Sequence, residues 1–198
     1  MNQDIELSSD GTGDLEARLK EAVRAGQIAS DMFDDTCARF FGINRTDGRC
    51  MDIIDRHGRI TAGQLASEAG LTTGAVTAVI DRLEAAGYAQ RVRDRADRRK
   101  VWIELTGAAN LIGGRIFSHY QLLRPTVLEQ FTPDQIDAIL RFLTVGAEVN
   151  REQAALLERH VDPSSAGPGA RAERAEAYER AAHALMAERI ASLKRSRR

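Results

Sequence analysis

The stretch that decides the fold runs from Gly58 to Thr106 and reads GRITAGQLASEAGLTTGAVTAVIDRLEAAGYAQRVRDRADRRKVWIELT. Its first signal is Thr61, followed three residues later by Gln64. A threonine oxygen can accept a hydrogen bond from the third helical amide while the glutamine side chain reaches back to the capping amide, so this spacing marks a helix start. We therefore expect a short helix over about residues 62–69.

A sharp turn and a second helix follow. Gly70 can take the positive φ of a tight turn, Thr72 can cap the next helix, and Gly87 can end it. Apolar side chains recur on one face of this second helix at helical spacing, at Val76, Val79, Ile80 and Leu83. Two helices joined by a short turn that contains glycine predict a helix-turn-helix.

A charged hairpin comes directly after the second helix. Residues 88–93 and 101–105 suit β-strands, and in the second run apolar and polar positions alternate. The segment between them, RDRADRRK (93–100), carries charges that cannot form a core and must face solvent or a polyanion. A basic hairpin in this place is a wing. We expect a mainly α fold with a small β-wing, in which a winged helix-turn-helix DNA-binding lobe joins a helical dimerisation lobe.

The run LTTGAVTAVIDRLEAAGY (71–88), followed by DRADRRKVWIELT (94–106), resembles the MarR family of winged-helix transcriptional regulators. The wing signature of that family is close to D-x-x-D-R-R-x-x-x-V-x-L-T. The residues that match its spacing are Asp94, Asp97, Arg98, Arg99, Leu105 and Thr106. Ile103 stands where valine is usual, and Arg95 stands where the family has proline. The resemblance covers roughly residues 43–157.

Composition narrows the class of protein. The chain has 198 residues, of which 29% are charged and 5% aromatic, which is typical of a helical protein rich in solvent-exposed surface. No run approaches the ~18 apolar residues that a membrane span needs, and the polar, acidic N-terminus is not a secretory signal. Cys37 and Cys50 form neither a metal motif nor a disulfide framework, so we expect a cytoplasmic protein. We find no catalytic motif, and expect no enzyme activity, cofactor or metal.

The charge distribution favours nucleic acid more than the net charge of −1 does. Residues 1–57 carry 7 Lys/Arg against 12 Asp/Glu, whereas residues 58–105 carry 8 against 6 and residues 162–198 carry 8 against 5. Positive charge is thus concentrated at the wing and at the C-terminus, and it is local charge that meets phosphate. Charge runs are usually solvated faces, and the alternative is a winged-helix module that binds protein.

The terminal helices carry more apolar surface than a small winged lobe can cover, so we expect a homodimer.

We expect the first helix to bend or break near Gly26, and Pro125 to break or kink a later helix. The C-terminal helix either docks on the dimer lobe or adds a phosphate-binding arm. The expected segments are a disordered N-terminus (1–13), a dimerisation helix (14–42), the winged domain (43–106), further dimerisation helices (107–161), a linker (162–170), and an amphipathic helical extension with a basic tail (171–198).

Sequence-specific binding needs side chains on base edges, held in register by phosphate contacts. The expected base-facing residues are Thr72, Thr73, Gly74, Ala75, Thr77 and Ala78. Arg82 either contacts DNA or pairs with Asp97. On the wing, Arg98 and Arg99 suit the minor groove, and Arg93, Arg95 and Lys100 suit phosphates. Asp94 and Asp97 would orient these arginines or shape the turn.

The family resemblance further implies a repressor that binds a pseudo-palindromic operator in double-stranded DNA and is released by a small, commonly aromatic or phenolic, ligand. The ligand crevice would be formed by Met32, Phe33, Cys37, Phe40, Met51 and Phe117, for which ordinary core packing is the alternative. Some relatives sense oxidants through a reactive cysteine. Redox sensing by Cys37 or Cys50 is therefore a second hypothesis, and buried inert thiols are the alternative to it.

Overall fold

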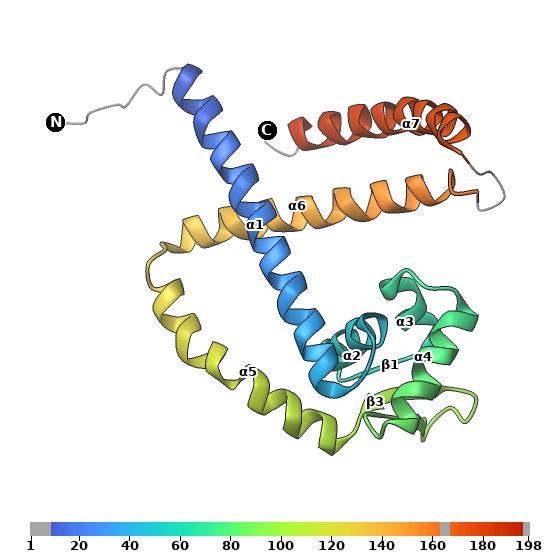
Figure 1. Ribbon diagram of the computed structural model, residues 1–198. Helices are drawn as coiled ribbons and strands as arrows, with labels where there is room; N and C mark the ends of the chain where they lie inside the picture. Colours follow the sequence, from blue (N-terminus) through green and yellow to red (C-terminus); the bar gives the residue numbers. More distant parts are fainter. Residues whose placement is uncertain (1–8, 163–166, 196–198) are drawn as a thin grey trace. The chain divides into compact units, whose positions relative to one another are not determined.

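The computed structural model describes residues 9–162 and 167–195 (Figure 1). Its elements follow in the order α1 (Ser9–Phe41), α2 (Arg45–His57), β1 (Arg59–Ile60), α3 (Ala62–Ala69), α4 (Thr73–Ala85), β2 (Ala89–Arg93), β3 (Val101–Leu105), α5 (Gly107–Leu128), α6 (Pro133–Glu158) and α7 (Pro168–Arg195). This confirms the predicted fold class, mainly α with a small β-wing. The chain divides into two compact units, one up to His119 and one from Tyr120 onward.

Local capping signals place the helix-turn-helix, which α3 and α4 form. The Thr61 hydroxyl accepts a hydrogen bond from the Gln64 amide at 3.3 Å, and the Gln64 side chain accepts one from the Thr61 amide at 3.1 Å. This is the predicted capping box. Gly70 has a φ of 63°, and the Thr72 hydroxyl accepts a hydrogen bond from the Ala75 amide at 3.2 Å. The turn and the start of α4 therefore follow the sequence prediction.

The core of the winged lobe lies under the inner face of α4. Val76, Val79, Ile80 and Leu83 are no more than 2% exposed, as their helical spacing predicted. They pack with Cys50, Met51, Ile53, Ile54, Ile60, Leu65, Ala66, Ala69, Ala89, Ile103 and Ala109. Burying one large aliphatic side chain contributes about 1.5–3 kcal/mol, so this cluster fixes which face of α4 points outward.

Three antiparallel strands complete the lobe, in the order β1-β3-β2. β2 and β3 form the predicted hairpin. β1 was not predicted, because two residues give no alternation to recognise. In the sheet Ile103 lies opposite Ile60 of β1 on one side and Arg91 of β2 on the other. The central strand thus joins the hairpin to the segment that leaves α2.

The first helix differs from its prediction at two places. It begins at Ser9, so residues 9–13, which we expected to be disordered, are helical; residues 1–8 lie outside the described part of the chain. It also continues through Gly26 without a break. One glycine costs a helix only about 1 kcal/mol relative to alanine, which the other residues of a 33-residue helix can offset.

The end of α1 is attached to the winged lobe by Tyr88. The Tyr88 hydroxyl donates a hydrogen bond to the Phe41 carbonyl at 2.9 Å, and the two rings meet edge to face with centroids 5.2 Å apart. Gly42, with a φ of 69°, then turns the chain towards α2. This contact joins residues 47 apart in sequence, which is why no local pattern marked it.

In the second unit, α5 runs through Pro125 to Leu128, so of the two predicted outcomes the break does not occur and the kink stays a prediction. Proline removes the amide that would bond the carbonyl four residues earlier. That residue is Gln121, which is exposed, so water can take the place of the missing amide. Helix α6 begins as predicted, with Thr132 as N-cap, Pro133 in the first turn and a capping box to Gln135.

Helix α7 lies beside α6 in an antiparallel arrangement (Figure 1). It begins at Pro168, three residues before the expected start, because proline suits the first turn of a helix. Polar contacts hold the pair: Tyr178 donates to Gln153 at 2.6 Å, and Arg189 pairs with Glu148. The middle of the expected linker (163–166) and the end of the basic tail (196–198) lie outside the described residues.

Val76→Ala removes two methyl groups from a fully buried side chain. We expect it to lower the free energy of unfolding by about 2 kcal/mol, through lost apolar burial and the cavity left behind. Val101→Ala is the matched control, because that side chain is 38% exposed, and it should cost less than half as much. Urea unfolding followed by fluorescence of Trp102, the single tryptophan, measures both losses. Equal losses would contradict the position of Val76 in the core.

Candidate nucleic-acid interface

The outer face of α4 begins with small side chains. The predicted base-facing residues Thr72, Thr73, Gly74, Ala75, Thr77 and Ala78 are all exposed. The Thr77 hydroxyl donates to the Thr73 carbonyl at 2.9 Å, so it offers a partner its lone pairs and its methyl group. A Cβ added at Gly74 would meet nothing within 4 Å. A partner can therefore approach the α4 backbone closely at this face.

Arg82, the only long cation of α4, is held by a buried carboxylate. Its Nε and Nη2 donate to Asp47 of α2 at 3.0 and 2.5 Å, and this hydrogen bonding raises the pKa of Arg82. The Asp47 side chain is 3% exposed, and Asn44 also donates to it at 2.9 Å. Of the two predicted roles of Arg82, the pairing with Asp97 is therefore wrong, and the contact with DNA stays a prediction. A buried carboxylate must be paired, whereas a wing aspartate is solvated.

Arg91 of β2 is tied to α4 in a similar way. It donates to Asp81 at 2.8 Å and also pairs with Glu84, whose carboxylate accepts a hydrogen bond from the Arg91 amide at 2.8 Å. The hydrogen bond to Asp81 raises the pKa of Arg91. The sequence did not single out Arg91, because its partners lie 7 and 10 residues away across a turn. This pairing fixes the start of the hairpin against α4.

The two wing aspartates shape the turn. Asp94 accepts hydrogen bonds from the amides of Ala96 and Asp97 at 2.8 and 2.9 Å, and Asp97 accepts one from the amide of Arg99 at 3.0 Å. The Arg99 side chain lies 3.6 Å from the Asp97 carboxylate but is 95% exposed. A solvated ion pair of this kind is weak. Of the two predicted roles, the geometry favours ordering of the turn over orientation of the arginines.

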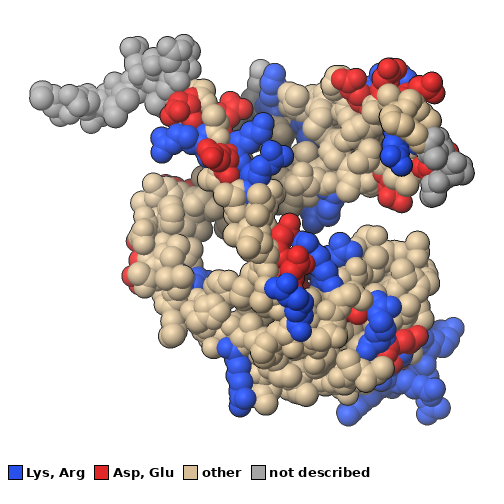
Figure 2. All heavy atoms as spheres, in the orientation of Figure 1, with Lys and Arg blue, Asp and Glu red and all other residues tan. Residues whose placement is uncertain are grey.

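The cationic side chains of the wing point into solvent. Arg93, Arg95, Arg98, Arg99 and Lys100 are all exposed. Figure 2 shows Lys and Arg gathered at the edge of the winged lobe, where the loop between β2 and β3 projects. The predicted phosphate-facing and groove-facing residues therefore lie together in the projecting loop and at the end of β2, the strand that follows α4.

Trp102 of β3 joins three charged groups at the base of the wing. Its indole N–H donates to Asp94 at 2.7 Å. Lys100 Nζ lies 4.0 Å and Arg59 Cζ 4.8 Å from the ring centroid. The hydrogen bond from Trp102, with the two amide bonds, lowers the pKa of Asp94 to about 2. The sequence predicted no role for Trp102; a single tryptophan beside a basic run was the available signal.

The residues of the predicted ligand crevice have different surroundings. Met51 belongs to the core cluster, in agreement with the alternative that it is an ordinary core residue. Phe33 meets Phe117 edge to face at 5.8 Å, which brings α1 and α5 together. Met32 and Phe40 are 66% and 70% exposed on α1. Cys37 is half-buried. The structure thus joins two of the six side chains directly and places a third in the core.

Both thiols are poor candidates for redox chemistry. Cys50 is fully buried and Cys37 half-buried. Burial raises the pKa of each, and the neighbouring Asp34 adds to the rise at Cys37. A higher pKa leaves less of the reactive thiolate at neutral pH. The geometry therefore weighs against redox sensing by either cysteine.

Over residues 9–162 and 167–195, no group of three or more His, Cys, Asp and Glu side chains is placed to hold a metal ion. None of the helices in these same ranges is long and apolar enough to cross a membrane.

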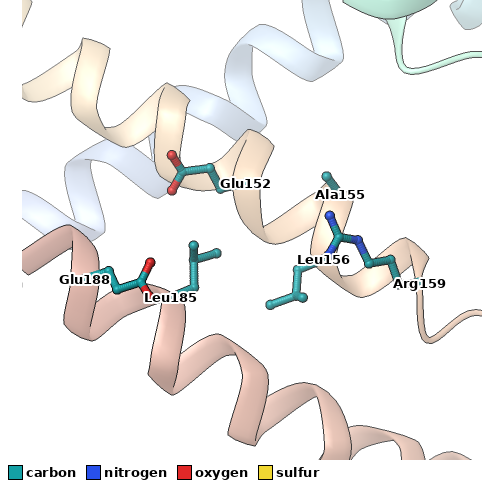
Figure 3. Close-up of a pocket in the computed structure, with 6 residues that line it drawn as sticks. All are labelled: Glu152, Ala155, Leu156, Arg159, Leu185 and Glu188. Carbon is teal, nitrogen blue, oxygen red and sulfur yellow. The ribbon is translucent and has the colours of Figure 1, made fainter.

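A cavity of about 400 Å³ lies in the second unit, between α6 and α7 (Figure 3). Apolar walls and charged residues line it: Glu152, Ala155, Leu156 and Arg159 of α6, with Leu185 and Glu188 of α7. Its volume is in the range of small-molecule sites, about 300–1,000 Å³. It shares no residue with the predicted crevice, so the two are separate places in the chain.

Comparison with known proteins supports the interpretation of the lobe. The MarR family model matches residues 43–101, from before α2 to the first residue of β3. YcgE of Bacillus subtilis (strain 168), an uncharacterised HTH-type transcriptional regulator, is 32% identical over 146 residues, which make up 74% of this chain and 95% of YcgE. YwhA, another uncharacterised HTH-type regulator of that strain, is 29% identical over 129 residues, 65% of this chain and 93% of YwhA.

Among solved structures, the chain resembles Streptococcus pneumoniae FabT, whose crystal structure is a complex with DNA. The TM-score is 0.55 at 23% identity, over 69% of this chain and 98% of FabT. This similarity supports the fold. All three proteins are covered almost completely, whereas part of this chain has no counterpart in them.

Arg82→Ala should destabilise the winged lobe, because it leaves the buried carboxylate of Asp47 without a charged partner. Arg93→Ala, at an exposed arginine of the same lobe, is the control and should have little effect on stability. Adding Asp47→Asn to Arg82→Ala should recover part of the loss, since the amide carries no charge. Thermal unfolding of the single and double variants measures the coupling. Additive losses would mean that the pair does not act as a unit.

We expect Cys50 to react with a thiol reagent at neutral pH only when the protein is unfolded. Cys37 should react more slowly than a free thiol, because its raised pKa reduces the thiolate fraction. Labelling rates with and without urea measure both, and Cys37→Ser and Cys50→Ser variants assign each rate. A thiol that reacts faster than free cysteine in the folded protein would restore the redox hypothesis.

Proposed function

The chain belongs to the MarR family of winged-helix, DNA-binding transcriptional regulators, and from this premise we propose that it is a homodimeric repressor of a pseudo-palindromic operator. One observation carries the proposal: an exposed face of small residues on α4 is followed by a projecting loop of exposed cations. A protein-binding module would need neither the close approach to α4 nor a wing of solvated arginines.

On DNA, the first half of α4 enters the major groove. Its small side chains allow close approach, and the methyl groups of Thr73, Ala75 and Thr77 can touch thymine methyls. Arg98 and Arg99 enter the adjacent minor groove, where narrow A·T tracts attract cations. Arg93, Arg95 and Lys100 meet phosphates. Because α4 offers few hydrogen-bonding groups, affinity comes mainly from the wing and the phosphate contacts.

A second copy of the chain would cover the apolar side chains that one copy exposes. Each of the following is at least 40% exposed: Leu15, Leu19, Ile28 and Met32 of α1, Leu111, Leu122 and Leu123 of α5, and Leu140, Phe142 and Leu143 of α6. Exposed apolar surface of this extent is typical of an interaction site. A two-fold dimer presents two α4 helices to half-sites about one helical turn apart, which matches a pseudo-palindrome.

The effector would be a small aromatic or phenolic molecule bound near Phe33 and Phe117, a pair of the predicted crevice whose rings are in contact. It would act by binding more tightly to a dimer whose α4 spacing does not fit the operator. Met51 takes no part in this site, since it lies in the core.

A gel shift with the DNA upstream of the chain's own coding sequence tests the function. A shift that survives excess nonspecific DNA supports sequence-specific binding, and sedimentation at the same concentration should give a dimer. If no DNA shifts, the protein-binding module becomes the better interpretation. Release of a specific complex by a panel of phenolic acids would support the effector.

Arg98→Ala and Arg99→Ala should each weaken DNA binding. Each should also reduce the slope of log K against log salt by about 0.9, the value for one phosphate contact. Arg141→Ala is the control, because this exposed arginine of α6 lies outside the winged lobe and pairs with Asp137. Fluorescence anisotropy across a salt series gives both quantities. Full operator binding by the Arg98/Arg99 double variant would disprove the role of the wing.

A further inference from the structure

The base of the wing contains a side chain that the proposed DNA contacts do not use. The hairpin loop, residues 95–99, carries Arg95, Arg98 and Arg99, and its two ends are Asp94 and Lys100. The backbone closes the loop at these ends. The Asp94 amide donates to the Lys100 carbonyl, and the Lys100 amide donates to the Asp97 carbonyl, both at 2.9 Å.

The side chains of the same two end residues meet at Trp102. The indole N–H bonds Asp94 at 2.7 Å, while the Lys100 ammonium lies 4.0 Å from the ring centroid, within the range of a cation–π contact. Arg59 of β1 contacts the same ring at 4.8 Å. One indole therefore holds both ends of the loop and connects them to β1, the strand on the other side of β3.

We propose that Trp102 is a positioning residue for DNA binding: by holding Asp94 and Lys100, it fixes the loop so that Arg98 and Arg99 meet the DNA in one orientation. This inference rests on the proposed function. A loop that is already ordered loses less conformational freedom on binding than one whose ends are free, so a rigid wing binds more tightly with the same contacts.

The three contacts can be separated by substitution. Trp102→Phe keeps an aromatic face for Lys100 and Arg59 but removes the N–H that bonds Asp94. Trp102→Leu removes both the aromatic face and the N–H. Asp94→Asn weakens the same hydrogen bond from the other side, because a charged acceptor becomes a neutral one. Tyr88→Phe is the matched control: it also removes a hydrogen-bond donor from an aromatic ring of this lobe, but far from the wing loop.

We expect Trp102→Phe to weaken DNA binding about tenfold, equivalent to one hydrogen bond, and Trp102→Leu to weaken it further. The salt slope should stay at the wild-type value, because no phosphate-facing cation is lost. Combining Trp102→Phe with Asp94→Asn should weaken binding by less than the sum of the two single losses, because both changes act on the hydrogen bond between Trp102 and Asp94. Tyr88→Phe should bind DNA as the wild type does. Anisotropy across a salt series, below the unfolding temperature of every variant, measures these effects.

NMR without DNA gives a second readout, provided that each variant is still folded at the pH of the measurement. In the wild type the Asp94 carboxyl should titrate at about 2, and in Trp102→Phe its pKa should rise towards the ordinary value of 3.8. Backbone relaxation should show residues 95–99 becoming mobile in Trp102→Phe and unchanged in Tyr88→Phe.

Three outcomes would overturn the proposal. The first is wild-type affinity in both Trp102 variants. The second is additive losses in the double variant with Asp94→Asn, which would mean that the two residues do not act through their shared hydrogen bond. The third is an Asp94 pKa and a loop mobility that Trp102→Phe leaves unchanged. If the wild type binds no DNA, the proposed function fails, and the NMR measurements still decide whether Trp102 orders the loop.

Discussion

A buried carboxylate on α2 needs a positive partner, and Arg82 on α4 supplies it. The Asp47 side chain is almost completely enclosed, so an ion pair and the hydrogen bond from Asn44 must replace its lost hydration. The apolar face of α4 could tolerate small rotations against the core, whereas a two-point hydrogen bond between guanidinium and carboxylate cannot. The pair therefore fixes the angle at which α4 presents its small residues.

The basic residues of the winged lobe fall into two groups because of such contacts. Arg82 and Arg91 are tied to carboxylates and hold α2, α4 and β2 together. The arginines of the wing loop are solvated, and the side chains that order this loop are Asp94, Asp97, Lys100 and Trp102. A guanidinium bonded to a buried carboxylate has fewer N–H donors left for phosphate than a solvated one, so the wing arginines are the more available cations.

Local signals predicted most of the winged lobe, because capping boxes, turn glycines and apolar spacing act over three or four residues. They missed β1, which is too short to show alternation, and the breaks that were one of two predicted outcomes at Gly26 and Pro125 do not occur. The candidate site also has a part that local signals predicted and a part that they did not. The exposed residues of α4 and the wing could be recognised from sequence, whereas the partner of Arg82 could not.

The sequence by itself determined the helices, the two strands of the hairpin, their order and the position of the wing, since each depends on neighbours along the chain. Only the tertiary structure decided how charges are paired. Asp47 and Arg82 are 35 residues apart in sequence. The sequence contains several aspartates that could pair with Arg82, and the burial of Asp47 distinguishes it from the others. The place of Trp102 between Asp94, Lys100 and Arg59 also depends on three strands coming together. Electrostatic pairing depends on distance and desolvation, and both quantities exist only once the chain has folded.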